Sequence, residues 1–229
     1  MASQSALASN IDDPRASSEA VPRRGMMYVL SAPSGGGKSS IAAALMQRDP
    51  NLRLSLSMTT RPQRPGEVDG QHYIFASDDE FDAAIESGEL LEYADVMGQG
   101  YRYGTPRQPV EDSLEAGVDV LFDIDWQGTR QLAEKMRLDL VTIFVLPPSM
   151  DELERRLRGR GRDPEDVIAR RMAKAAEEIS HWGEYQYILI NRDFNETVDQ
   201  AEMILRGARL KRRRQTGMGG FVKDLLDNA

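Results

Sequence analysis

The 229-residue chain carries 29 lysines and arginines against 37 aspartates and glutamates, so its net charge at neutral pH is −8. This balance argues against a protein that binds nucleic acid through a general excess of positive charge. The chain has no cysteine and only two histidines, far apart in sequence. Disulfide frameworks, thiolate zinc sites, cysteine nucleophiles and poly-histidine metal sites are therefore excluded. Of the 29 basic residues 24 are arginine. Composition alone does not show whether these arginines occupy particular sites or simply replace lysine at the surface.

Residues 1–24 are rich in serine and alanine and are predicted to form a disordered tail. Acidic residues within this segment, and its lack of an apolar stretch, argue against a secretory signal and weaken the alternative of a transit peptide. No part of the chain approaches the ~18 consecutive apolar residues of a membrane span. We therefore expect a cytoplasmic protein with no membrane partner.

Downstream of this tail, short apolar runs alternate with longer amphipathic segments. Several runs are continuously apolar, which is typical of strands buried on both faces of a parallel sheet. The predicted strands span residues 26–32, 53–58, 118–124, 141–146 and 186–190. This alternation predicts an α/β fold whose core is a parallel five-stranded sheet flanked by helices.

Capping signals predict where several helices begin. A helix over residues 38–48 follows a glycine-rich turn, and one over 106–116 has Thr105 as its N-cap and Pro106 at its first helical position. Residues 149–152 fit a capping box, in which a serine and a glutamate satisfy two backbone N–H groups. Asn195 is predicted to cap a final helix that ends near residue 214.

Two segments interrupt the alternation of strands and helices. Residues 55–105 are turn-rich and aromatic, include a small helix opened by residues 77–80, and predict an inserted mixed α+β lobe. Residues 153–172 are dense in arginine and predict a small lid. The predicted core comprises the remaining residues, 25–54, 106–152 and 173–229. Inserted lobes of this kind are often moving parts that close on a substrate.

The strongest chemical signal is the segment SAPSGGGKSS at residues 31–40, which lies between a predicted strand and a predicted helix. Glycines let backbone N–H groups turn toward phosphate oxygens, and the helix N-terminus adds positive potential. Lys38 is predicted to reach the β- and γ-phosphates of a nucleotide, and the Ser39 hydroxyl to bind Mg²⁺. The strict pattern has glycine where Ala32 stands. The predicted phosphate-binding residues are Ala32, Pro33, Ser34, Gly35, Gly36, Gly37, Lys38 and Ser39.

Asp123 lies at the end of the predicted strand over 118–124, and Asp125 directly follows that strand. A carboxylate at the carboxyl end of a strand beside a phosphate loop can hold Mg²⁺ through water. The alternative is an ordinary solvated strand end.

Residues of the inserted lobe indicate which molecule accepts the phosphoryl group. Arg61 and Arg64 lie in a proline-rich turn with Tyr73 shortly after, and these groups could clamp the monophosphate of a second nucleotide. Glu92 lies among apolar residues, and a carboxylate can accept both the N1–H and the 2-amino group of guanine. Thr105, or the backbone near it, could bind O6 of the base. The alternatives stay open: Arg61 and Arg64 in an ordinary surface turn, Glu92 on the exposed face of a strand, and Thr105 as a helix cap only.

Seven arginines fall within residues 155–171. A run of charge is usually a solvated helix face, and we favour that interpretation for Arg155, Arg158, Arg162 and Arg170. The others could swing over a triphosphate and offset its charge as the γ-phosphoryl group transfers. The basic stretch 206–214 lies at the end of a predicted helix, where cations suit the helix dipole, and is interpreted as structural or solubilising.

Together these motifs resemble the guanylate kinase family, whose members phosphorylate GMP with ATP. The resemblance runs from about residue 26 to 210 and covers SAPSGGGKSS, SLSMTTRPQRPGEVDGQHY, ELLEYADV, YRYGTP, FDIDWQG, and RRLRGRGRD with ARRM. It implies a nucleotide-binding transferase of purine nucleotide metabolism, with a P-loop core, a GMP-binding lobe and an arginine-rich lid. Bacterial-type members resemble this chain at Ala32.

The resemblance also implies roles for individual residues. At the guanine base it implies Ser57, Glu92 and Thr105. At the GMP phosphate it implies Arg61, Arg64, Tyr73 and Tyr103, with Glu67 orienting them. Arg156, Arg160 and Arg171 match the arginines that close on the transferring phosphate, and these three with Lys38 are the expected catalytic residues. Asn191 matches a position near the adenine of ATP. Asp123 and Asp125 match an element near Mg²⁺ and the GMP ribose or base, and we assign Asp123 with Ser39 to the metal and Asp125 to GMP, a division that stays open.

The implied substrates are therefore ATP and GMP, the implied cofactor is Mg²⁺, and the oligomeric state is left undetermined. No general base is expected, because the nucleophile is a phosphate oxygen that is already ionised. Three alternatives compete with this hypothesis. A different nucleoside-monophosphate kinase is disfavoured by the predicted guanine site. A non-catalytic binding module of the same family typically lacks a working phosphate loop. A P-loop GTPase would carry an Asn-Lys-x-Asp motif, which this sequence lacks.

Overall fold

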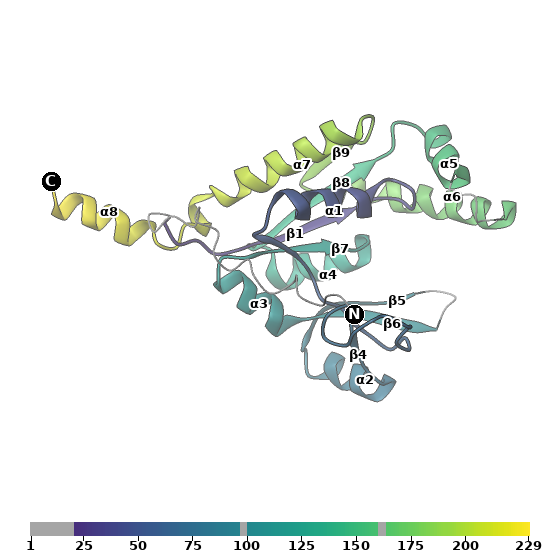
Figure 1. Ribbon diagram of the computed structural model, residues 1–229, viewed down its shortest axis with the longest axis horizontal. Helices are drawn as coiled ribbons and strands as arrows, with labels where there is room; N and C mark the ends of the chain where they lie inside the picture. Colours follow the sequence, from purple (N-terminus) through teal and green to yellow (C-terminus); the bar gives the residue numbers. More distant parts are fainter. Residues whose placement is uncertain (1–20, 97–99, 160–163) are drawn as a thin grey trace, which may run out of the picture.

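The computed structural model describes residues 21–96, 100–159 and 164–229 (Figure 1). Five strands form a parallel sheet in the order β2-β7-β1-β8-β9, which confirms the predicted core. Their bounds are β1 Met27–Ser31, β2 Leu52–Leu54, β7 Asp119–Asp123, β8 Leu140–Leu146 and β9 Tyr187–Ile190. The prediction of one strand over 53–58 was wrong, because residues 52–54 pair with β7 whereas Met58 begins a strand of a second sheet.

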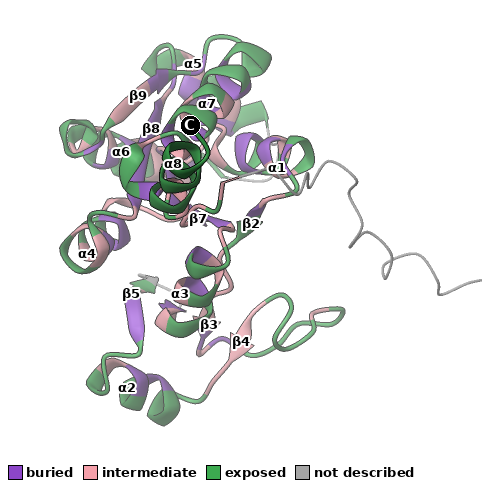
Figure 2. Ribbon diagram, turned by 90° about the vertical axis from the view of Figure 1, so that its left-hand side faces the viewer, coloured by how far each residue is buried: buried purple, intermediate pink, exposed green. Residues whose placement is uncertain are grey.

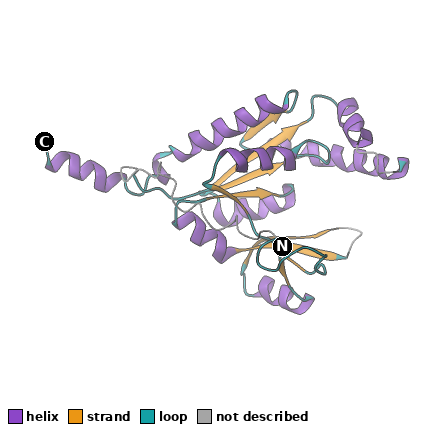
Figure 3. Ribbon diagram, viewed as in Figure 1, coloured by secondary structure: helices purple, strands orange, loops and turns teal. Residues whose placement is uncertain are grey.

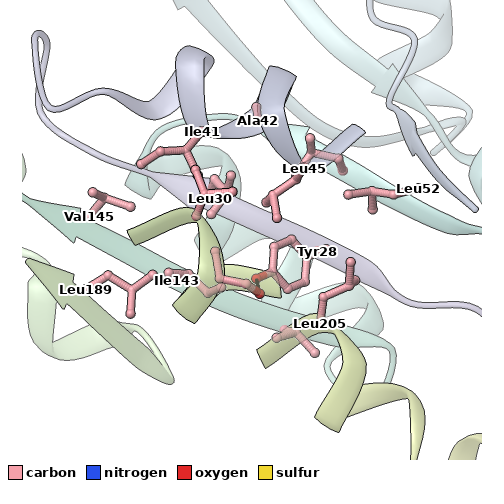
Figure 4. Close-up of a cluster of buried hydrophobic side chains, with 14 of the residues drawn as sticks. Tyr28, Leu30, Ile41, Ala42, Leu45, Leu52, Ile143, Val145, Leu189 and Leu205 are labelled. Carbon is pink, nitrogen blue, oxygen red and sulfur yellow. Dashed lines mark hydrogen bonds between the residues drawn. The ribbon is translucent and has the colours of Figure 1, made fainter. Parts of the chain in front are cut away.

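The central strand β1 shows why its apolar run is continuous. Side chains alternate between the two faces of a strand. Tyr28 and Leu30 pack with α1 (Lys38–Arg48) and α7 (Phe194–Arg209), while Met27 and Val29 pack with α3 (Arg107–Glu115) and α4 (Trp126–Met136). Helices thus cover both faces of the sheet (Figure 1), and Figure 4 shows the cluster on the side of α1 and α7.

The inserted lobe is built on a second, mixed sheet (Figure 3). The strand order of this sheet is β4-β3-β6-β5. Its strands are β3 Met58–Thr59, β4 Ile74–Phe75, β5 Leu90–Val96 and β6 Tyr101–Pro106, and its helix is α2, Asp78–Glu86. The predicted helix start is confirmed, since Ser77 and Glu80 form a reciprocal capping box. The lobe is tied to the core where Tyr93 and Gln131 exchange two hydrogen bonds of 2.8 and 3.0 Å.

Two helices, α5 (Met150–Gly159) and α6 (Glu165–Ser180), make up the region of the predicted lid, and a short 3₁₀ turn at Trp182–Glu184 leads from α6 to β9. The predicted boundary at residue 172 falls inside α6. The capping box at residues 149–152 is half formed: the Ser149 hydroxyl accepts the Glu152 N–H at 3.1 Å, but the Glu152 carboxylate accepts from Arg155 and Arg156 instead.

Two predicted helix starts were wrong. Thr105 lies in β6 and its hydroxyl points to Glu92, so α3 begins after Pro106 with no side-chain cap. The N-cap of α7 is Asp193 rather than Asn195, because the Asp193 carboxylate accepts the Glu196 N–H at 2.9 Å. This helix also ends at Arg209, before the predicted residue 214, and a 3₁₀ turn at Arg212–Arg214 follows.

The segment before β1 lies beside the segment after α7, since the Arg24 N–H donates to the Arg214 carbonyl at 2.7 Å and the Gly217 N–H donates to the Pro22 carbonyl at 2.9 Å. Arg23 and Arg24 fall in the segment expected to be a tail, yet they pair with Asp119 and Asp139 at 2.8 and 2.9 Å, while residues 1–20 lie outside the described chain. The last helix, α8 (Met218–Asp227), extends away from the body with exposed side chains (Figures 1 and 2). Among the described helices none is long and apolar enough to cross a membrane.

Candidate functional site

The glycine-rich segment forms a loop between the end of β1 and the start of α1, as its sequence predicts. Gly35 and Gly37 have φ values of +90° and +100°, a conformation that favours glycine over any residue with a Cβ. Gly37 occupies the N-cap of α1, so the first N–H groups of that helix open toward the loop. A cavity of about 290 Å³ is lined by residues 32–35 and 37–40 and by Glu178. This is the geometry of an anion site at a helix N-terminus.

The end of β7 meets this loop. One oxygen of the Asp123 carboxylate lies 2.7 Å from Lys38 Nζ, and the other accepts the Ser39 hydroxyl at 3.0 Å. A hydroxyl and a carboxylate are the oxygen ligands that Mg²⁺ uses when substrate phosphates and waters complete its shell. In the described residues no group of three or more His, Asp or Glu side chains is arranged to hold a metal. The pair therefore fits a metal that arrives with a nucleotide.

The predicted guanine residues lie in one row across the second sheet. Glu92 of β5 pairs with Thr105 of β6, and the antiparallel register of Met58 with Gly104 puts Ser57 opposite Thr105. The Thr105 hydroxyl donates to Glu92 Oε1 at 2.5 Å, and Glu92 is 5% exposed. Burial raises the pKa of the Glu92 carboxyl above its ordinary value, and the Thr105 hydrogen bond opposes that rise.

Asp125 links this row to the core. It is the N-cap of α4, where one carboxylate oxygen accepts the N–H groups of Gln127 and Gly128 at 3.0 and 3.3 Å. Its negative charge also contributes to the raised pKa of Glu92. Asp123 thus contacts the phosphate loop, whereas Asp125 caps the helix whose Gly128 lies beside Glu92: a Cβ at Gly128 would lie 3.0 Å from Glu92 Oε2. The end of β7 is where the two candidate nucleotide sites meet.

Arg61 organises the predicted monophosphate site. Its guanidinium group donates to the Tyr103 hydroxyl at 3.2 Å and to Glu67 at 2.7 Å, and it lies 5.2 Å from the centre of the Tyr73 ring. Glu67 also accepts the backbone N–H of Arg64 at 2.8 Å. The Arg61 hydrogen bond, followed by that of the Arg64 N–H, lowers the pKa of Glu67. The side chain of Arg64 is exposed, so the cluster can present cationic groups to an anion while Glu67 holds the turn together.

The predicted lid arginines divide into two groups. Arg155, Arg158 and Arg170 pair with acidic residues of their own or the neighbouring helix, in agreement with a solvated face. Arg156 also pairs with Glu152 of its own helix at 2.8 Å, but it donates in addition to the backbone carbonyl of Asn191 at 3.0 Å. Arg171 lies on α6 with its side chain partly buried. Arg160 and Arg162 lie outside the described residues. Arg156 is thus linked to the phosphate loop through Asn191, whose side chain donates to the Gly36 carbonyl.

Asn191, which the resemblance puts near the adenine of ATP, contacts the phosphate loop. Its side chain is buried, and its amide nitrogen donates to the Gly36 carbonyl at 3.0 Å. A Cβ at Gly37 would lie 2.5 Å from that same nitrogen, so glycine is required there for a second reason. Asn191 thus supports the phosphate loop from within.

Glu178 was missed by the sequence analysis. It lies on α6, is 9% exposed, and accepts the Ser34 N–H at 3.1 Å. A signal was available in the spacing, because Glu178 falls on the same face of the helix as the buried Ile168 and Ala175. A glutamate on an apolar helix face is rarely buried without a partner.

Comparison with known proteins agrees with this geometry. The model of the family described as guanylate kinase matches residues 24–208. The chain belongs to the guanylate kinase family. A guanylate kinase of Bradyrhizobium diazoefficiens is 54% identical over 207 residues, which cover 90% of this chain and 94% of that protein. One of Sphingopyxis alaskensis is 55% identical over 204 residues, which cover 89% and 92%.

A solved structure of the family is also similar. The crystal structure of guanylate kinase from Anaplasma phagocytophilum matches with a TM-score of 0.69 at 39% identity, over 88% of this chain and 95% of that one. Family membership makes this chain a nucleotide-binding kinase, and the expected family, fold class and enzyme class are confirmed.

Proposed function

We propose that this chain transfers the γ-phosphoryl group of ATP to GMP, giving ADP and GDP. The observation that carries the proposal is the meeting of two sites at the end of β7. Asp123 bonds the loop residues Lys38 and Ser39, and Asp125 accepts the N–H of Gly128, which lies against the buried carboxylate of Glu92. A donor triphosphate on the loop and an acceptor monophosphate held by the lobe would then face each other.

The proposed roles of the acceptor side follow from donor and acceptor chemistry. Glu92 can accept from both the N1–H and the 2-amino group of guanine, which adenine cannot supply. Ser57 and Thr105 lie beside Glu92 in the same row and can bind the rest of the base edge. Arg61, Arg64, Tyr73 and Tyr103 would hold the phosphate, and Asp125 the ribose or base. These groups favour GMP over the monophosphates of other nucleotides.

On the donor side, catalysis is positioning plus stabilisation of charge. Loop N–H groups and Lys38 bind the triphosphate, and Arg156, Arg160 and Arg171 of the lid offset the charge that develops on the transferring group. Bound Mg²⁺, held by Ser39 and Asp123, would neutralise charge on the β- and γ-phosphates. The nucleophile is a phosphate oxygen, so the chain needs no general base. We assign residues 55–105 to GMP binding and 153–172 to a lid whose closure excludes water.

A coupled assay of ADP formation with ATP and Mg²⁺ tests the proposal. GMP, AMP, UMP and dTMP are compared as acceptors, and we expect turnover with GMP at least about a hundredfold above the others. Lys38→Ala should abolish transfer while circular dichroism remains that of the wild type, since Lys38 is partly exposed and contacts Asp123 and the Ile124 carbonyl at the end of β7 rather than the hydrophobic core. A preference for another acceptor, or an active Lys38→Ala variant, would overturn the assignment.

A further inference from the structure

Glu178 faces the phosphate cavity from the lid side. Its carboxylate is among the groups that line the cavity, together with Lys38 and Ser39. One oxygen accepts the Ser34 N–H at 3.1 Å, and the other lies 3.7 Å from Lys174 Nζ. Burial raises the pKa of Glu178, and the Ser34 N–H, Lys174 and Lys38 oppose that rise. A carboxylate beside a site for polyphosphate repels the ligand, so direct phosphate binding does not explain its position.

Glu178 accepts a different backbone N–H group from those that a bound phosphate would use. The N–H groups available to an anion at a helix N-terminus are those of the first turn, and α1 begins at Lys38. Ser34 precedes both glycines with positive φ, at the opposite end of the loop. Ser34 is one of the predicted phosphate-binding residues, but in this structure its N–H donates to Glu178. The N–H groups of the first turn of α1 are left for the ligand.

The same helix face carries a lid arginine. Arg171, Lys174 and Glu178 are spaced by three and four residues on α6, so they lie along one face over two turns. A shift of α6 would therefore move Arg171 and the Glu178–Ser34 contact together.

We propose that Glu178 is a positioning residue that holds the phosphate loop in its ATP-binding shape and couples that shape to lid helix α6. This inference rests on the proposed ATP site. It assigns the carboxylate an indirect action on ATP through the Ser34 backbone, with no contribution to GMP binding.

Two variants separate the acceptor role from the charge. Glu178→Ala removes the hydrogen-bond acceptor, whereas Glu178→Gln keeps an oxygen that can accept the Ser34 N–H. We expect Glu178→Ala to raise both the KM for ATP and the Kd for ATP, measured by calorimetry in the presence of Mg²⁺, by about tenfold or more. Its KM for GMP should stay within about twofold, and Glu178→Gln should recover most of the loss. Glu177→Ala, at the exposed neighbour on α6, is the matched control and should behave as wild type.

Every other pattern contradicts the proposal. Unchanged ATP binding in Glu178→Ala would remove the positioning role, and tighter binding would show that the carboxylate opposes the nucleotide. Equal losses in the alanine and glutamine variants, or equal rises in the KM for both substrates, would show a charge effect or a general structural effect. Calorimetry reads ATP binding without turnover, so failure of the wild type to phosphorylate GMP would count against the proposed function alone.

Discussion

At the scale of single residues, Glu92 shows how burial prepares a group for recognition. Its carboxylate is almost fully enclosed, which raises its pKa, and nearby Asp125 raises it further. A carboxyl group with a raised pKa is ionised above that value and protonated below it. Glu92 therefore gains a proton at a higher pH than an exposed glutamate does, and once protonated it can no longer accept two hydrogen bonds from guanine.

The first prediction compares GMP with inosine monophosphate, which lacks the 2-amino group but carries the same phosphate. Glu92→Gln offers one acceptor, so we expect its preference in kcat/KM for GMP over inosine monophosphate to fall by about tenfold or more. In the wild type that preference should decline as the pH is lowered toward the raised pKa of Glu92, and in the variant it should not change with pH. The ratio cancels titration of the substrate phosphate. An unchanged preference in the variant would take Glu92 out of the base site.

At the scale of elements, the sequence predicts a feature well when the residues that form it are close together along the chain. The phosphate loop and α1 follow from consecutive residues, and the structure has α1 at the predicted bounds of 38–48. Thr105 was predicted to cap a helix because it directly precedes Pro106. Its actual partner, Glu92, is 13 residues away on the neighbouring strand, so no local pattern indicated it. The contacts of Asn191 and Glu178 with the loop span more than 140 residues. No local pattern reports such a contact, although a glutamate on an apolar helix face was a usable signal.

The start of α7 gives a test of capping at this scale. Asp193 satisfies the Glu196 N–H, and the exposed Asn195, inside the helix, does not cap it. We expect Asp193→Ala to lower the free energy of unfolding by about 1 kcal/mol, because a helix N–H loses its acceptor. Asn195→Ala should change it by less than about 0.5 kcal/mol. Urea unfolding of both variants decides the point, and a larger loss in Asn195→Ala would restore the cap predicted from sequence.

At the scale of the whole molecule, the placement of arginine explains more than the net charge does. Some arginines belong to the candidate phosphate sites, as at Arg61 and Arg156. Others hold the segment after α7 against the core: Arg209 bridges Asp49 and Asp119, and Arg214, which is 1% exposed, donates to the Gly25 carbonyl at 3.2 Å. The basic stretch at 206–214 was interpreted as structural or solubilising, and these contacts make part of it structural.

The last prediction concerns Asp119, which lies at the centre of that network and is fully buried. Its carboxylate accepts from Arg23, from Arg209 and from the backbone N–H of Met26. Asp119→Asn keeps the shape but removes the charge, which leaves two guanidinium groups without their shared partner, so we expect a loss of about 3 kcal/mol in the free energy of unfolding. Arg206→Ala, which breaks an exposed pair with Glu202, should cost less than about 0.5 kcal/mol. Urea unfolding of the two variants, analysed with the same m-value, compares their free energies of unfolding. The KM values for ATP and GMP should not change in Asp119→Asn, because Asp119 lies at the opposite end of β7 from Asp123. Equal losses in the two variants would show that the buried network contributes no more than a surface ion pair.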